Sequence, residues 1–166
     1  MIVIEKVGTD GIDTIHSLAH LIWQAAYKDI LSPEQMAYML ELIYSKTSLH
    51  QQITEKHHQF IIAFENERPV GFASYSIKSS EEPLTYRLHK IYIDPAIQGK
   101  GLGKKLLQYI LDDIQVHHPI SLELNVNRHN KAIEFYKSMG FTIIKEEDID
   151  IGNSYFMNDY IMNLQL

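Results

Sequence analysis

Apolar positions recur along the chain with two different periods, and each change of period marks a predicted element. Spacings of three and four predict helices over 12–27, 33–44, 47–55, 101–116 and 131–139. Alternating or short apolar runs predict strands over 1–6, 60–64, 70–77, 85–93, 120–126, 141–151 and 155–164. This order of strands and helices indicates an α+β fold built on a mixed sheet.

Local signals support several of these boundaries. Ser32-Pro33-Glu34 combines an N-cap, a proline at the first helical position and an acid in the first turn. Asn130 is the expected N-cap of the helix over 131–139, and Gly140 its end. Gly152-Asn153 is the expected turn of a final hairpin.

Composition limits the class of protein. The 166 residues, of which 45% are hydrophobic, fit one domain over 1–166. The absence of cysteine excludes disulfides, thiolate metal sites and a cysteine nucleophile. No apolar run is long enough for a signal peptide or a membrane span, so we expect a cytoplasmic protein with no membrane partner.

Charge bears on the partners. With 15 Lys+Arg against 21 Asp+Glu, the formal net charge is −6, which argues against a nucleic-acid partner. The acidic balance favours a cationic amine as substrate, with Glu34 and Glu41 as candidate acids near its pocket. A homodimer is left open.

A glycine-rich turn between a strand and a helix is the strongest chemical signal. Residues 98–103 hold three glycines, which permit positive φ and close approach to a ligand. Lys100, Lys104 and Lys105 stand at the helix start, where the dipole prefers anions, so a bound phosphate would compensate them. The alternative is a flexible surface loop with solvated lysines.

Two common phosphate motifs do not fit this turn. A P-loop needs glycine where Gln98 stands and a hydroxyl residue where Lys105 stands. A dinucleotide fingerprint needs a third glycine at Lys104, and residues 94–98 separate the strand from the glycines.

The segment Ile-Tyr-Ile-Asp-Pro followed by Gln-x-x-Gly-x-Gly, residues 91–103, resembles motif A of the GNAT superfamily of N-acetyltransferases. The resemblance implies a three-layer fold, with helices flanking a central mixed, mostly antiparallel sheet. It also implies that acetyl-CoA binds through Ile91, Tyr92, Ile93, Gln98, Gly99, Lys100, Gly101, Leu102, Gly103 and Lys104.

A second segment, Asn130-x-Ala-Ile-x-Phe-Tyr136-x-x-x-Gly-Phe, resembles motif B of the same superfamily. The resemblance implies that Tyr136 is the general acid and that an asparagine contacts the cofactor. Asn130 precedes the alanine by two residues where three is commoner, so Asn127 and Asn130 both remain candidates.

The resemblance implies transfer of acetyl from acetyl-CoA to a primary amine, with a small amine or polyamine as the expected acceptor. Without cysteine, transfer should be direct, in a ternary complex. A protein or peptide acceptor and a non-catalytic coenzyme A-binding module are the alternatives. The general base is expected to be His89, whose ordinary pKa suits neutrality, with Glu123 or water as alternatives.

Two further residue sets have open roles. The aromatic residues Trp23, Tyr27, Tyr38 and Tyr44 either wall an acceptor pocket or belong to the core. His16 and His20, four apart on a helix, lack the glutamate and third ligand of a zinc site, so we expect no metal.

Overall fold

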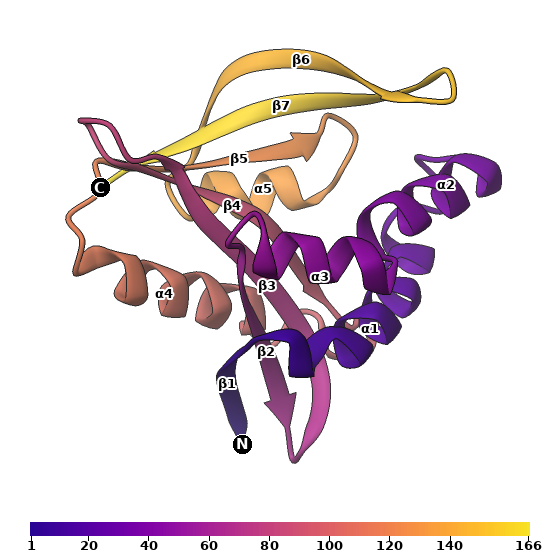
Figure 1. Ribbon diagram of the computed structural model, residues 1–166, viewed down its shortest axis with the longest axis horizontal. Coiled ribbons are helices and arrows are strands. Elements are labelled where there is room, and N and C mark those ends of the chain that lie inside the picture. Colours follow the sequence, from indigo (N-terminus) through magenta and orange to yellow (C-terminus); the bar gives the residue numbers. More distant parts are fainter.

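The computed structural model describes all 166 residues, and its seven strands form one mixed sheet in the order β1-β2-β3-β4-β5-β7-β6 (Figure 1). Only the pair β4 and β5 is parallel. The predicted mixed, mostly antiparallel sheet is confirmed. The strands are β1 (Ile2–Val7), β2 (Gln59–Glu65), β3 (Arg68–Ser79), β4 (Thr85–Ile93), β5 (Ser121–Asn127), β6 (Thr142–Gly152) and β7 (Tyr155–Gln165).

Helices cover both faces of the sheet, which confirms the three-layer prediction (Figure 1). One face carries α4 and α5, and the other carries α1, α2 and α3. The helices are α1 (Ile12–Ala26), α2 (Pro33–Tyr44), α3 (Lys46–Thr54), α4 (Leu102–Gln115) and α5 (Ala132–Ser138). None of them is long and apolar enough to cross a bilayer.

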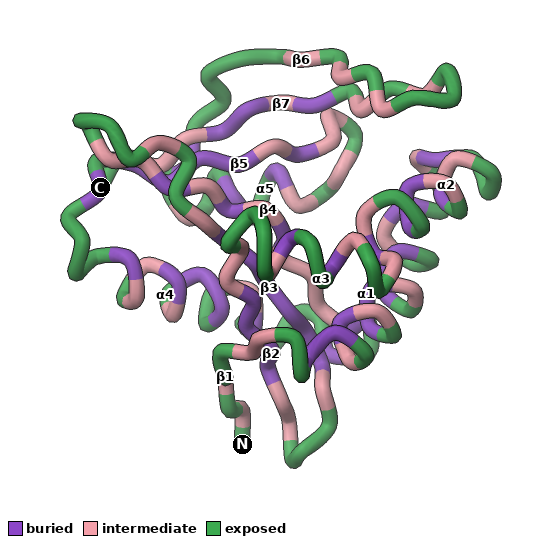
Figure 2. The backbone as a smooth tube through the Cα atoms, in the orientation of Figure 1, coloured by how far each residue is buried: buried purple, intermediate pink, exposed green.

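Two hydrophobic cores lie on the two faces because strand side chains alternate in direction. In β2, Ile61 and Ala63 belong to the core under α4 and α5, whereas Phe60 and Ile62 belong to the core under α1, α2 and α3. The two cores contain 20 and 16 buried residues. Figure 2 shows that burial is densest in the middle strands and lowest along β6.

A β-bulge interrupts β4 at His89. Ser74 pairs with Lys90 and the next residue, Tyr75, pairs with Leu88, so His89 is the extra residue of β4. A bulge shifts the alternation of side chains by one residue. Leu88 and Ile91 consequently contact the same core, under α4 and α5, although they are three residues apart.

The parallel strands β4 and β5 pair over part of their length and then diverge. β4 and β5 pair only through Thr85–Leu88 and Ser121–Leu124. Beyond these residues both strands continue, β4 to Ile93 and β5 to Asn127, without pairing to each other. The backbone of β4 therefore has no strand partner on this side, and a ligand can occupy the opening.

One predicted helix start is wrong by a residue. The N-cap of α5 is Lys131 rather than Asn130, and it makes no side-chain cap hydrogen bond. Asn130 acts one position earlier, where its Oδ1 accepts a hydrogen bond from Ala132 N at 2.9 Å.

Candidate active site

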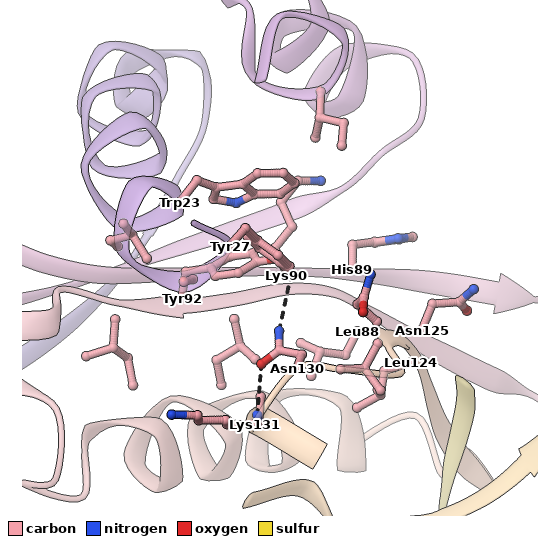
Figure 3. Close-up of a pocket in the computed structure, with 18 of the residues that line it drawn as sticks. Trp23, Tyr27, Leu88, His89, Lys90, Tyr92, Leu124, Asn125, Asn130 and Lys131 are labelled. Atoms are coloured by element: carbon pink, nitrogen blue, oxygen red, sulfur yellow. Dashed lines mark hydrogen bonds between the residues drawn. The ribbon is translucent and has the colours of Figure 1, made fainter. Parts of the chain in front are cut away.

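A cavity of about 1440 Å³ fills the opening between β4 and β5. It is larger than the roughly 300–1000 Å³ usual for one small ligand, so a long cofactor and an acceptor can share it. Its walls come from α1, α2, α3, β4, the 95–104 segment, β5, the start of α5, β6 and β7. Figure 3 shows part of this lining, with Trp23 and Tyr27 of α1 and its C-cap across from Asn130 and Lys131.

The glycine turn forms one end of the cavity. Gly99 and Gly101 have φ of +84° and +77°, a left-handed conformation that glycine adopts without strain. Gly101 is the N-cap of α4, so no side chain caps the helix and its first N–H groups are available to an anion. A Cβ at Gly99 or Gly101 would meet nothing within 4 Å, which leaves space for a ligand.

The lysines of this turn differ in position. Lys104 lines the cavity, whereas Lys100 is exposed and lies outside its lining. The first turn of α4 contains no acid. Gly103 packs closely, since a Cβ there would lie 3.2 Å from Ile93 and Phe135, and this fixes α4 against β4. The predicted residues of the turn thus form an open, uncapped helix start of the kind that suits an anion.

Tyr136 lies on α5 and lines the cavity from the side of α4 and α5. The residue is 7% exposed, and its hydroxyl makes no hydrogen bond within the chain. Burial is the main cause that raises the pKa of Tyr136, with nearby Tyr27 as a second cause. The phenol therefore keeps its proton at neutral pH, as a general acid must.

A chain of hydrogen bonds connects α1 to the start of α5 across the cavity. The Tyr27 and Tyr92 hydroxyls are 2.9 Å apart, and Asn130 Nδ2 donates to Tyr27 Oη at 3.3 Å (Figure 3). Asn127 also lines the cavity, but its Oδ1 accepts from His129 N. Both asparagines therefore face the cavity, and only Asn130 bridges its two walls.

His89 lines the cavity, but its expected pKa near neutrality is wrong. Its Nε2 is 2.7 Å from Ser76 Oγ, and its ring stacks on His58 with centroids 3.8 Å apart. Burial, helped by His58 and nearby cations, lowers the pKa of His89 to about 2. The imidazole is neutral at physiological pH but a weak proton acceptor, which disfavours it as the general base.

The glutamates singled out from the sequence lie elsewhere. Glu123 forms an ion pair with Lys78 at 2.6 Å and does not line the cavity. Glu34 and Glu41 are exposed and also lie outside the lining, so the expectation that they stand near the pocket is wrong. The carboxylates that do line it are Asp29 and Asp159.

The aromatic residues of the first helices divide between the two roles left open. Trp23, Tyr27 and Tyr44 line the cavity and are also buried in the core under α1, α2 and α3. Tyr38 does not line it and instead donates to the Ile151 carbonyl at 2.7 Å. This side of the cavity is therefore largely an extension of that core.

Sequence reasoning missed two buried charged residues in the cavity, Lys90 and Asp159. Burial lowers the pKa of Lys90 to about 7 and raises that of Asp159. Asp159 accepts from Asn125 Nδ2 at 3.4 Å. The position of Lys90 on the strand that leads to the glycine turn could have marked it as a candidate. The face of the sheet on which its side chain lies depends on the bulge.

The two histidines of α1 each contact a backbone carbonyl oxygen. His16 Nδ1 lies 2.7 Å from the Tyr44 carbonyl oxygen, and His20 Nδ1 lies 2.8 Å from the His16 carbonyl oxygen. No three His, Asp or Glu side chains are grouped so as to hold a metal ion.

Comparison with known proteins supports the same reading of the fold and the turn. The pattern of the "Acetyltransferase (GNAT) domain" family matches residues 27–157, most of the chain. The chain belongs to the GNAT acetyltransferase family. The matched residues of this GNAT domain include the glycine turn and both sides of the cavity.

Individual relatives of the GNAT chain differ in how much they share with it. The Thermoplasma acidophilum spermidine N(1)-acetyltransferase is 27% identical over 93% of this chain and 94% of its own length. The Mycobacterium tuberculosis N-alpha-acetyltransferase RimI is 30% identical, over 57% of this chain and 58% of its own length. The chain thus spans less than two thirds of the RimI relative.

A solved structure extends the likeness to the whole fold. The PaiA N-acetyltransferase of Thermoplasma acidophilum, in complex with coenzyme A, superposes with a TM-score of 0.83 at 25% identity. The match covers 100% of this GNAT chain and 99% of that one.

Proposed function

We propose that this GNAT chain transfers the acetyl group of acetyl-CoA to a primary amine of a small molecule, directly and in a ternary complex. The observation that carries the proposal is one continuous cavity with an anion-binding helix start at one end. Its other end is a chamber of aromatic and polar side chains, and Tyr136 also lines it. Such a cavity can hold donor and acceptor together.

The residues present fit coenzyme A. We assign the pyrophosphate to the backbone of the 98–103 turn and to Lys104, because this helix start is uncapped and open. The unpaired edge of β4, residues 91–93, is assigned to the pantetheine arm. Asn130 is the favoured asparagine contact, since it bridges both walls. When bound, acetyl-CoA supplies the thioester that is cleaved.

The reaction converts an ammonium group and a thioester into an amide, a thiol and one released proton. We assign Tyr136 the role of giving its hydroxyl proton to the leaving sulfur, because its hydroxyl is protonated and free of protein partners. Of the three base candidates, His89 is a weak acceptor and Glu123 lies outside the cavity. Water is therefore assigned the first ammonium proton, which is the one released. The second N–H proton, lost as the amide forms, restores the Tyr136 hydroxyl after it has protonated the sulfur, so the protons balance.

The acceptor has a second candidate class. A polyamine is supported by the relative named a spermidine N(1)-acetyltransferase, which matches nearly the full chain. A peptide N-terminus corresponds to the N-alpha-acetyltransferase relative, which matches a smaller part. The alternative of a non-catalytic coenzyme A-binding module predicts binding without turnover.

An acetyl-CoA turnover assay with a panel of amines and peptides tests the proposal. We expect thiol release that requires a small-molecule amine and exceeds hydrolysis of acetyl-CoA alone. Turnover with peptides alone would transfer the function to a peptide acetyltransferase. Tight acetyl-CoA binding with no turnover on any acceptor would favour the non-catalytic module.

A further inference from the structure

The acceptor end of the cavity is lined by basic side chains from two distant parts of the chain. They are Lys56 and His58, after α3, and Arg87, His89 and Lys90, on β4. These five residues are called the basic cluster below. Its members are close enough to act on each other electrostatically, because Lys56 and Arg87 both help to lower the pKa of Lys90.

The bulge at His89 assembles the β4 part of the cluster. In a regular strand, Arg87 and Lys90 would point to opposite faces, because they are an odd number of residues apart. The extra residue places both on the face of α1, α2 and α3. There Lys90 Nζ lies 5.8 Å and 5.5 Å from the ring centroids of Tyr44 and Phe60.

Lys90 is buried without a compensating charge. It is 8% exposed, and its ammonium donates to Gln52 Oε1 at 2.7 Å. No carboxylate lies within ion-pair distance of Lys90, and its two remaining N–H donors have no partner in the chain. Burial without an opposite charge disfavours the ammonium form of Lys90, and an anionic ligand in the cavity would pair with it and favour that form.

Arg87 is the other charged member of the cluster on β4, since His58 and His89 have lowered pKa values and are neutral at physiological pH. Arg87 makes one hydrogen bond, from Nη2 to Asn125 Oδ1 at 2.7 Å, and no ion pair. His58 Nδ1 is buried and has no hydrogen-bond partner. Asp159 is the buried carboxylate of the lining. It forms no ion pair, although Arg87 is close enough to lower its pKa against the raising effect of burial.

We propose that the acceptor carries an anionic oxygen group, a carboxylate or a phosphate, besides its amine, and that Lys90 and Arg87 bind this group. The inference rests on the proposed function and refines its substrate class. It disfavours polyamines, because their second cationic group would face the basic cluster. The anionic group pairs with Lys90 and Arg87 while the amine is left free to face the thioester.

Matched acceptor pairs test the proposal. L-alanine, L-phenylalanine and L-lysine are each compared with their amides, phosphoethanolamine is compared with ethanolamine, and spermidine is included. We expect kcat/KM for at least one anionic acceptor to exceed that of its neutral partner about 10- to 100-fold, the range of a charge-assisted hydrogen bond. The carboxylate and phosphate arms show which oxyanion fits. Equal or better turnover of the neutral partners, or spermidine as the best acceptor, overturns it.

Lys90→Met identifies the residue responsible, with Lys145→Met as the matched control on the exposed β6 strand. In Lys90→Met the preference for the anionic partner should disappear through a KM about 10- to 100-fold higher, with the KM for acetyl-CoA unchanged. The Lys145→Met enzyme should keep the preference. A fall in kcat at constant KM would make Lys90 a proton acceptor and overturn the assignment.

A binding measurement separates this inference from the proposed function. Trp23 is the sole tryptophan and lines the cavity, so its fluorescence can report acceptor binding without turnover. We expect quenching by the anionic compounds and little by their neutral partners, lost in Lys90→Met. If that pattern holds without any turnover, the acetyltransferase proposal fails and the anion site stands. If no anion binds in a Lys90-dependent way, the anion site is refuted.

Discussion

The two ends of the cavity are built by different means. The cofactor end is made of backbone, from a run of six residues in which two of the three glycines have positive φ and the helix start lacks a side-chain cap. The acceptor end is made of side chains that come from α1, α3, β4, β5 and β7. A site made of backbone depends little on side-chain identity, whereas a side-chain site can change its ligand by substitution. Tyr136, on α5, stands in the lining common to both.

The largest expected effect is on Tyr136, in the lining that the two ends share. Tyr136→Phe removes a hydroxyl that makes no hydrogen bond in the chain, so folding stability should barely change. We expect kcat to fall by about 10² to 10⁴ with acetyl-CoA affinity intact, the range of general acid catalysis. Steady-state kinetics and calorimetry measure both quantities.

Tyr109→Phe, on α4 outside the cavity lining, is the control for this change. It should leave kcat unaltered. If Tyr136→Phe stays within about threefold of wild type at every pH, the leaving sulfur takes its proton from another donor.

The next largest effect is expected on acetyl-CoA affinity, from substitutions of Gly101 at the cofactor end. Gly101→Asp adds a negative charge where the pyrophosphate is assigned, while Gly101→Asn adds nearly the same shape without charge. The space around Gly101 is open, and both side chains tolerate left-handed φ better than most, so the fold should survive in each. We expect acetyl-CoA affinity to fall at least about 100-fold for Asp and distinctly less for Asn.

Calorimetric titration of acetyl-CoA into the two folded variants makes this measurement. Equal losses for Asp and Asn would mean that shape rather than charge matters at position 101. Unchanged affinity in both would remove the pyrophosphate from this turn.

A smaller effect concerns the stability cost of the acceptor end. Replacing buried ion pairs by apolar side chains of similar volume can stabilise a protein by about 1–4 kcal/mol, and we expect a gain in this range for Lys90→Met, whose charge has no partner to lose. The folded pKa of Lys90, about 7, is below the ordinary 10.5, so the unfolded chain binds the proton more tightly. The gain should be full below pH 7 and should shrink as the pH rises toward 10.5.

Urea unfolding of wild type and Lys90→Met at pH 6 and pH 9 gives the two differences in free energy of unfolding. A difference that is independent of pH would show that Lys90 keeps an ordinary pKa in the folded protein. A destabilised variant would show that Lys90 is compensated by groups of the chain itself.

The smallest expected effect is on the pH profile of His89→Gln. With a pKa of about 2, His89 does not titrate between pH 5 and 9, so the shape of log kcat/KM against pH should not change. Loss of an ionisation in that range would return His89 to the role of general base.

Most elements of the fold could be predicted because their signals are local. The helix over 33–44 begins with Ser32 and Pro33, and the structure reproduces its bounds. The hairpin and the helix after the glycine turn also lie within a residue or two of their predicted limits. The start of α5 was predicted one residue too early. The Asn130 side chain accepts a hydrogen bond from a backbone N–H, as an N-cap would, although Lys131 is the N-cap.

The sequence by itself determined the family, the glycine turn at the start of a helix and the position of Tyr136 on a packed helix. These depend on contiguous residues, whose glycines and helical spacing set the backbone without help from the rest of the chain. Only the tertiary structure decided the acceptor end. One extra residue in the pairing of β3 with β4 turned Arg87 and Lys90 to the same face, and burial moved the pKa values of His89 and Lys90. Strand register and desolvation are properties of the packed molecule, because both depend on neighbours that are distant in the chain.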